Sequence, residues 1–161
     1  MIRFVVIASL LAGCRISLDD SNQESSSRKC TVSMTSQPCL DSTSHSDLTW
    51  IETKIFAAHC NFSGCHNGAA TPQGKVDLRT GSSHAHLVNV ASAIDPSRKL
   101  VVPNDLEASY LLLMVGDVPA AMADPPGTVP SVGLMPQNSS PLCCQKLDVL
   151  ERWIMAGAPN N

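Results

Sequence analysis

The chain has 161 residues, a length that suits one modest domain with some appended segments. Its 11 Lys and Arg residues stand against 14 Asp and Glu residues, for a formal net charge of −3, and no basic cluster appears. Nucleic-acid binding therefore has no electrostatic support. Aromatic residues make up only 4% of the chain, so we expect cysteines, a metal or a large apolar cofactor to help fill the core.

The N-terminus has the pattern of an exported bacterial protein. Arg3 precedes an apolar run, Phe4 to Ala12, that is too short to span a bilayer. Such a run is typical of a secretory signal peptide; a buried N-terminal helix is the alternative. The sequence LLAGC that follows resembles the lipobox of bacterial lipoproteins. This resemblance implies a signal peptide over residues 1–13, lipidation of Cys14, and a place in the cell envelope, periplasmic or at the outer-membrane surface.

Residues 14–46 are predicted to form a tether between this anchor and a compact domain. The stretch DDSNQESSS has no hydrophobic period, as in flexible linkers. Cys30 and Cys39 lie in the later part, where they can close a small disulfide loop or tie the tether to the domain. Disulfides persist outside the cytoplasm, and lipidation of Cys14 leaves six of the seven cysteines to be explained.

The compact domain is expected over residues 47–161 and to begin with a helix. Ser46 or Asp47 can cap this helix, which leads directly into a Cys/His motif. Its apolar face is formed by Leu48, Ile51, Ile55 and Phe56.

Residues 67–103 are punctuated by Gly and Pro and are predicted to be irregular. A short helix follows, capped by Asn104 or Asp105. Its shared face is formed by Leu106, Tyr110 and Leu113. Residues 116–137 form a Pro-rich loop that is long for a compact domain, and such loops are often functional.

The last predicted helix has the clearest pattern. Ser140 is expected to cap it, Pro141 to occupy its first position, and Gly157 to end it. Its buried stripe is formed by Leu147, Leu150, Trp153 and Ile154.

The motif HCNFSGCHNG, residues 59–68, holds two cysteines and two histidines. The spacing from Cys60 to Cys65 and His66 is one residue longer than the C-x-x-C-H motif of covalent haem attachment. In that motif two thiols form thioethers with the haem, and the following histidine ligates the iron. The flexible residues 63–64, Ser-Gly, can absorb the extra position.

Three other interpretations of this motif stay open on local grounds. Cys60 and Cys65 can form a disulfide with each other, or each can pair with Cys143 or Cys144. A zinc site is the third interpretation, but no second C-x-x-C or H-x-x-x-H motif completes four ligands.

A haem iron held by one histidine takes a second protein ligand in many electron carriers, and a methionine there raises the reduction potential. Met135 lies in the sequence GLMPQ, where Pro136 would stiffen the loop before the last helix. Met122, in AAMADPP, is the rival ligand. Met114 and Met155 lie in predicted helices and are expected in the core.

The order of these motifs resembles a family of cytochrome c-like domains common in exported proteins of planctomycetes and myxobacteria. Family members typically show a Cys–Cys–His motif, a DL turn, a V-x-P-G-x-P-x-x-S-x-L segment, an MP loop and a closing W-I-x-x-G-A. The matching pieces here span about 100 positions: IFAAHCNFSGCHNG, VDLRTG, HLVNVAS, VVPNDLEASYLL, LMPQ and LDVLERWIMAGA. Asn104 and Leu106 stand where the family has Gly and Pro.

The resemblance implies an all-α, cytochrome c-like fold, with a few helices around one haem and long irregular loops. It implies that Cys60 and Cys65 bind haem c covalently, that His66 is the proximal iron ligand and that Met135 is the distal one. The expected role is one-electron transfer to a redox partner protein, by a domain held at the membrane through its lipid anchor. No Ser/His/Asp set, catalytic carboxylate pair or phosphate loop stands out, so no enzyme activity is predicted.

With two cysteines on haem and Cys14 lipidated, four cysteines remain. A disulfide between the neighbours Cys143 and Cys144 would be strained, so pairing of each with Cys30 or Cys39 accounts for all four. Three disulfides among six cysteines are equally consistent with the count. The alternative function is then a haem-free, disulfide-stabilised lipoprotein domain with a structural or binding role; a haem protein with an open sixth coordination position is a third hypothesis.

The other histidines and the basic residues receive weaker assignments. His84 and His86 are expected in a solvated loop, with a place beside the haem pocket as the alternative, and His59 is expected to face away from the iron. The candidates to neutralise haem propionates are Arg79, Arg98 and Lys99.

Overall fold

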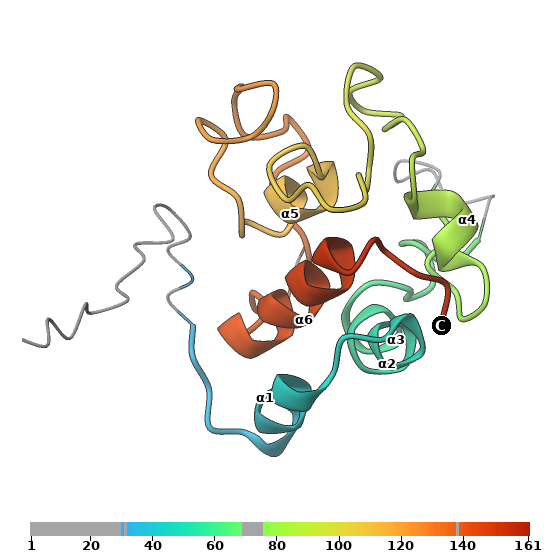
Figure 1. Cartoon of the computed structure of the whole chain (residues 1–161), viewed down its shortest axis with the longest axis vertical. Helices are drawn as coiled ribbons and strands as arrows, with labels where there is room; N and C mark the ends of the chain where they lie inside the picture. The colour runs from blue at the N-terminus through green and yellow to red at the C-terminus, as the bar shows by residue number, and fades with distance from the viewer. Residues whose placement is uncertain (1–29, 31, 69–75, 138) are drawn as a thin grey trace, which may run out of the picture.

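The computed structural model describes residue 30 and residues 32–68, 76–137 and 139–161. The predicted signal peptide, Cys14 and most of the predicted tether lie outside this range. The described residues form helices, turns and isolated bridges but no strand, in agreement with the all-α class (Figure 1). The helices are α1 (Gln37–Leu40), η1 (Asp41–Ser44), α2 (Leu48–Ile51), η2 (Glu52–Phe56), α3 (Ala57–His59), α4 (Ser83–Leu87), α5 (Tyr110–Met114) and α6 (Cys144–Met155).

The compact part of the chain begins earlier than predicted. Residues 37–44, assigned above to the tether, form α1 and the 3-10 turn η1. The guanidinium of Arg152, on α6, donates to the carbonyl oxygens of Ser42 and His45 at 3.0 and 2.8 Å. The prediction of a flexible tether up to residue 46 is therefore wrong for this stretch, because α6 supplies partners that the local composition does not reveal.

The helix predicted after Asp47 is confirmed. The Asp47 carboxylate accepts a hydrogen bond from the backbone N–H of Trp50 at 2.8 Å, as an N-cap does. The helical segments α2, η2 and α3 follow one another without a break, and η2 is a π-helical turn. The whole predicted apolar face is at most 1% exposed: Leu48, Ile51, Ile55 and Phe56.

The middle of the chain is mostly irregular, as predicted, with two differences. Residues 83–87 form α4 rather than a solvated loop, and the His84 ring contacts the carbonyl of Ala158 through Nε2 at 3.0 Å. The helix expected from Asn104 starts only at Tyr110, because Asn104 adopts a φ of +63° that no α-helix accepts. Asp105 instead accepts from the N–H of Ala108 at 3.0 Å and closes a local turn.

Helix α6 has the predicted buried stripe and the predicted end, but a different start. Gly157 follows its C-cap with a φ of +91°, the left-handed conformation that suits glycine. The helix begins at Cys144 rather than at Ser140. Its first N–H donates to the carbonyl of Val32 at 2.8 Å, so the N-terminal segment takes the place of the expected serine cap.

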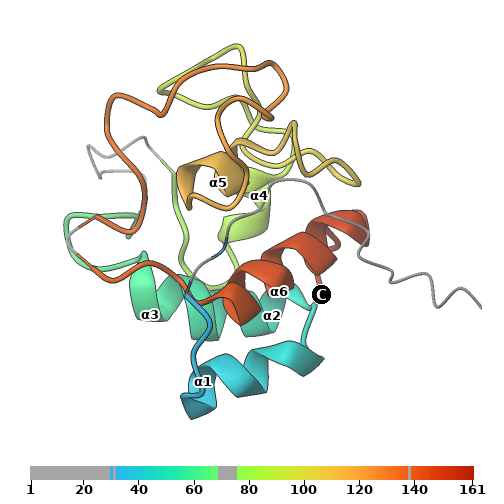
Figure 2. The ribbon, with the colours of Figure 1, turned by 90° about the vertical axis from the view of Figure 1, so that its left-hand side faces the viewer.

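Helix α6 lies between α1 and α5 (Figures 1 and 2), and its stripe supplies much of the core. The indole of Trp153 is fully buried, and its Nε1 donates to the carbonyl of Pro159 at 2.9 Å. Among the described residues no helix is long and apolar enough to cross a membrane.

Two disulfides fasten the N-terminal segment to the start of α6. Cys30 pairs with Cys144, and Cys39 pairs with Cys143, over sequence separations of 114 and 104 residues. These are the four cysteines left over when Cys60 and Cys65 are assigned to haem.

The two disulfides should be strongly non-additive. While one of them remains, the long loop stays closed, and the other closes only a ring of about ten residues. In the chain-entropy account such a ring contributes about 2.7 kcal/mol, against about 4.7 kcal/mol for a loop of about 100 residues. We expect the pair Cys30→Ala, Cys144→Ala and the pair Cys39→Ala, Cys143→Ala each to lower the free energy of unfolding by about 3 kcal/mol.

Removing all four cysteines should then exceed the sum of the two separate losses by about 2 kcal/mol. Urea unfolding of the three variants, with unchanged m-values for the two single-disulfide deletions, measures this difference. Strictly additive losses would contradict the account, since they would mean that each disulfide acts on its own part of the native state.

Candidate functional site

The end of α3 places the first cysteine of the Cys/His motif. The N–H groups of Cys60 and Asn61 both donate to the carbonyl of Phe56, at 2.8 and 2.9 Å, and close the last turn. The chain then folds back, because the N–H of His66 donates to the carbonyl of Cys60 at 3.2 Å. Gly64 permits this tight loop with a φ of +81°. We call residues 60–66 the Cys–His loop.

Cys60 and Cys65 are the free cysteines of the described chain, and both are half-buried. Burial raises the pKa of the Cys60 thiol to about 12; the neighbouring Cys65 adds to the rise, and the positive charge of Lys146 opposes it. The thiol is therefore protonated at neutral pH. Within the described ranges, no group of three or more His, Cys, Asp or Glu side chains is placed to hold a metal ion.

His66 brings an imidazole whose hydrogen bonding is incomplete. Its Nδ1 is buried and has no hydrogen-bond partner within the described residues. Burial lowers the pKa of His66, although the nearby backbone of Val76 acts in the opposite direction. A neutral ring with an unsatisfied buried nitrogen is unusual in a folded protein and is the form of histidine that binds iron or another metal.

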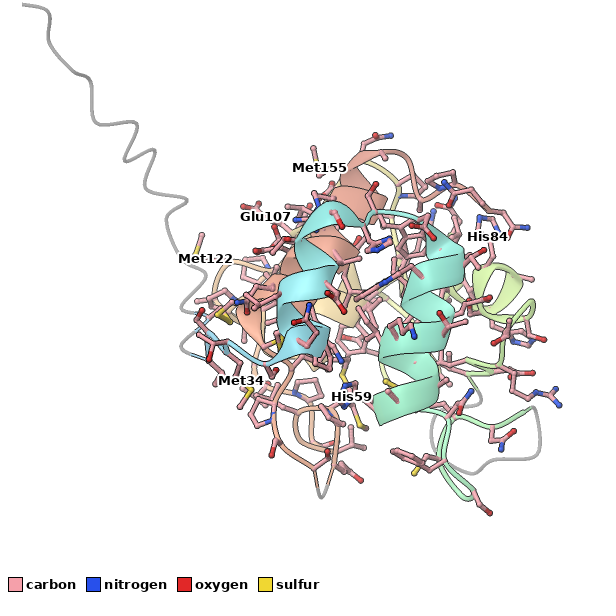
Figure 3. All side chains as sticks on the ribbon, turned by 90° about the horizontal axis from the view of Figure 1, so that it is seen from below. Met34, His59, His84, Glu107, Met122 and Met155 are labelled. Atoms are coloured by element: carbon pink, nitrogen blue, oxygen red, sulfur yellow. A yellow bond between two sulfur atoms is a disulfide. The ribbon has the colours of Figure 1, made fainter. Side chains whose placement is uncertain are left out.

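The two candidate methionines are both half-buried against the core. The N–H of Met135 donates to the carbonyl of Met114, at the end of α5, at 2.7 Å. Met135 is thus fixed to α5 rather than to the Cys–His loop. The Cys–His loop and the segment that leads from Met135 into α6 nevertheless project from the same side of the molecule (Figures 2 and 3).

The basic residues considered for haem propionates differ in their surroundings. The guanidinium of Arg79 pairs with Asp77, with Nη2 and Oδ2 at 2.7 Å, and this pairing holds the pKa of Asp77 below its usual value. Arg98 is buried: it pairs with Asp95 at 3.0 Å, donates to the carbonyl of Pro125 and lies over the ring of Tyr110. Arg79 and Lys99 are both exposed. Both arginine side chains thus already donate to acceptors within the protein, whereas no ion pair of Lys99 is found among the described residues.

The fold and the Cys–His loop can now be compared with those of known proteins. No protein-family model, curated protein or solved structure matches this chain. The cytochrome c-like resemblance therefore rests on the sequence motifs alone, and the site has to be interpreted through its own chemistry.

Lys146 escaped the sequence-based prediction. It lies on α6 and is only 6% exposed, and its Nζ lies 2.7 Å from the Nε2 of His59 and 3.1 Å from the carbonyl oxygen of Lys54. A signal was present, since Lys146 interrupts the apolar stripe of the last helix, four residues before Leu150. His59, expected only to face away from the iron, is thus the partner of a buried amine.

The raised pKa of Cys60 predicts a slow reaction with alkylating agents. Because only the thiolate reacts, Cys60 should be modified by iodoacetamide at pH 8 on the order of a thousandfold more slowly than a free cysteine with a pKa of about 8.5. We expect its rate to keep rising up to about pH 11 rather than to level off near pH 9. Mass spectrometry of the Cys60 peptide, in a haem-free Cys65→Ser variant, measures this rate.

Lys146→Met is the matched variant for this experiment. Loss of the positive charge should slow the alkylation of Cys60 further at those pH values at which Lys146 is protonated, because its charge opposes the rise in the pKa. A Cys60 rate that levels off by pH 9 in the parent protein would refute the assignment of a buried, protonated thiol.

Proposed function

We propose that this domain is a membrane-anchored, extracytoplasmic mono-haem protein that transfers single electrons. In this proposal Cys60 and Cys65 hold haem c through thioether bonds, and His66 and Met135 are the axial ligands. The observation that carries the proposal is the division of the cysteines. Four are paired in two disulfides, while the two beside His66 are free.

The donor set fits a haem better than it fits a bare metal ion. Thioether formation uses the cysteine sulfurs as covalent anchors, so it does not need the thiolates that zinc requires. The buried Nδ1 of His66 has no hydrogen-bond partner in the described chain, and a neutral imidazole is the form of histidine that ligates iron. Methionine, a soft thioether ligand, suits haem iron and not zinc.

Exposed apolar side chains near the same loops support a large apolar ligand. Phe62, in the Cys–His loop, is 52% exposed, and Leu134, next to Met135, is 46% exposed. Val129 and Val132, in the same Pro-rich loop as Leu134, are 55% and 38% exposed. Apolar side chains exposed on the loops that carry the proposed ligands are available to contact such a ligand, and the chain has few aromatic residues to fill a core without a cofactor.

When bound, the haem supplies the one-electron couple. The chain's own residues would set the position and potential of that couple. Cys60, at the end of α3, would hold the haem covalently, and His66 follows after a loop closed on the Cys60 carbonyl at 3.2 Å. Met135, held to α5 through its backbone, would raise the potential as a methionine ligand does. This role uses no catalytic acid, base or nucleophile, and the redox partner would be a protein of the cell envelope.

Covalent attachment is tested by producing the protein in a bacterial strain that has haem-attachment machinery. We expect a Soret band that survives denaturation and acid–acetone extraction, and a haem mass on the peptide containing Cys60 and Cys65. The double variant Cys60→Ser, Cys65→Ser should lose both signals. Its matched control is Cys39→Ser, Cys143→Ser, which should keep the haem because those cysteines lie in a disulfide. A disulfide-linked Cys60–Cys65 peptide without haem would instead favour the haem-free alternative.

The distal ligand is tested by comparing methionine variants of the haem-loaded protein. Met135→Ala should lower the reduction potential and abolish the methionine–iron charge-transfer band, because a thioether ligand favours the reduced iron. Met122→Ala, at the rival position, and Met155→Ala, at a residue that is 52% exposed, are the controls and should leave both unchanged. Loss of the band in Met122→Ala alone would transfer the role to Met122.

A further inference from the structure

A half-open cavity of about 620 Å³ lies among α1, the α2–η2–α3 stretch and the start of α6. His59 and Met34 mark its surroundings in Figure 3 and are both among its lining residues. Cys60, Cys65 and Met135 do not line it, so it is separate from the proposed haem site.

The cavity has a basic, polar part and an apolar part. The basic part is formed by Lys54, Lys146 and His59, and the apolar wall includes Met34, Trp50 and Leu142. Asp41 is the one acidic residue among the lining residues, and its carboxylate already accepts a hydrogen bond from Gln37 at 2.5 Å. The lining therefore carries more positive than negative charge.

Lys146 brings to the cavity a buried positive charge that has no ion-pair partner among the described residues. Its ammonium has three N–H donors, of which two have acceptors at hand, the Lys54 carbonyl and the His59 ring. None of the ion pairs found among the described residues includes Lys146. A buried ammonium without a counter-ion is costly, and burial accordingly lowers the pKa of Lys146.

The His59 ring accepts one N–H of Lys146 and leaves another N–H for an anion. Burial and the charge of Lys146 lower the pKa of His59, so the ring is neutral and its Nε2 can accept a hydrogen bond from Nζ at 2.7 Å. The remaining donor of Lys146 then has no acceptor in the described chain. Hydroxyl groups of Ser139 and Ser140, also in the lining, add further donors.

We propose that this cavity binds an organic carboxylate, with its charged group on Lys146 and its apolar body against Trp50 and Leu142. The carboxylate would supply the missing counter-ion and accept the third N–H of Lys146. The apolar wall would bury an aromatic or branched hydrocarbon group, as in other small-molecule sites.

The probe is 1-naphthoate, compared with 1-naphthamide, which has the same ring system without the charge. Calorimetric titration of the purified wild-type protein should show saturable binding of 1-naphthoate that is about tenfold or more tighter than that of 1-naphthamide. The His59 ring resonances should shift over the same concentration range. Equal affinities, non-saturating heats or unmoved His59 signals would each overturn the proposal.

The matched variants are Lys146→Met, which keeps the length and apolar stem of the side chain, and Lys99→Met, which removes an exposed lysine outside the cavity lining. Lys146→Met should weaken the binding of 1-naphthoate about tenfold or more and leave 1-naphthamide unchanged; Lys99→Met should change neither. Full 1-naphthoate affinity in a folded Lys146→Met protein would refute the site. If Lys146→Met does not fold, the wild-type comparison of the two compounds still decides.

Discussion

The two disulfides between the N-terminal segment and the start of α6 are the constraint on which the rest of the molecule depends. They bring residues 30–44 onto a helix more than 100 positions away in the chain. The N–H of Cys144 then donates to the Val32 carbonyl, and the Arg152 guanidinium donates to the carbonyls of Ser42 and His45. The same pairing decides the chemistry of the site, because it leaves Cys60 and Cys65 as the free thiols of the described chain.

Burial at the end of α3 links the two proposed sites of this domain. Cys60 and His59 are adjacent in sequence, and Lys146 interacts with both, through a hydrogen bond to the His59 ring and through its charge on the Cys60 thiol. Removal of the charge of Lys146 would therefore change the pKa of His59 in the cavity and the pKa of the Cys60 thiol in the Cys–His loop. An anion bound at Lys146 would likewise alter the electrostatic surroundings of the proposed haem, since unscreened charges interact strongly in a partly buried setting.

The sequence predicted those parts of the fold that depend on local pattern. The apolar face after Asp47, the stripe of α6 and the stop at Gly157 follow from spacing and capping, which operate within a few residues. It failed where distant contacts decide. Residues 37–44 look like a tether in composition, and Ser140 looks like a helix cap, until the disulfides and Arg152 are known. The late start of α5 depends on the left-handed backbone conformation of Asn104. An asparagine in the sequence is only a weak indication of that conformation.

The candidate site shows the same division. The Cys–His loop could be found from its motif, and the four disulfide cysteines could be set apart only by counting. The buried amine was missed because a lysine on an apolar stripe is usually dismissed as a side chain that reaches out to solvent. Here His59 and the Lys54 carbonyl hold it inside, 2.7 and 3.1 Å away.

The protonated state of Cys60 also bears on how the cysteines come to be sorted in an oxidising compartment. Thiol–disulfide exchange proceeds through attack by a thiolate. Burial raises the pKa of Cys60 to about 12, so this cysteine stays in the thiol form at physiological pH. Once α3 has packed, Cys60 is therefore a poor competitor for Cys143, although both lie close to Lys146 on the same side of α6. The packing that buries the Cys60 thiol thus also protects the disulfide at Cys143.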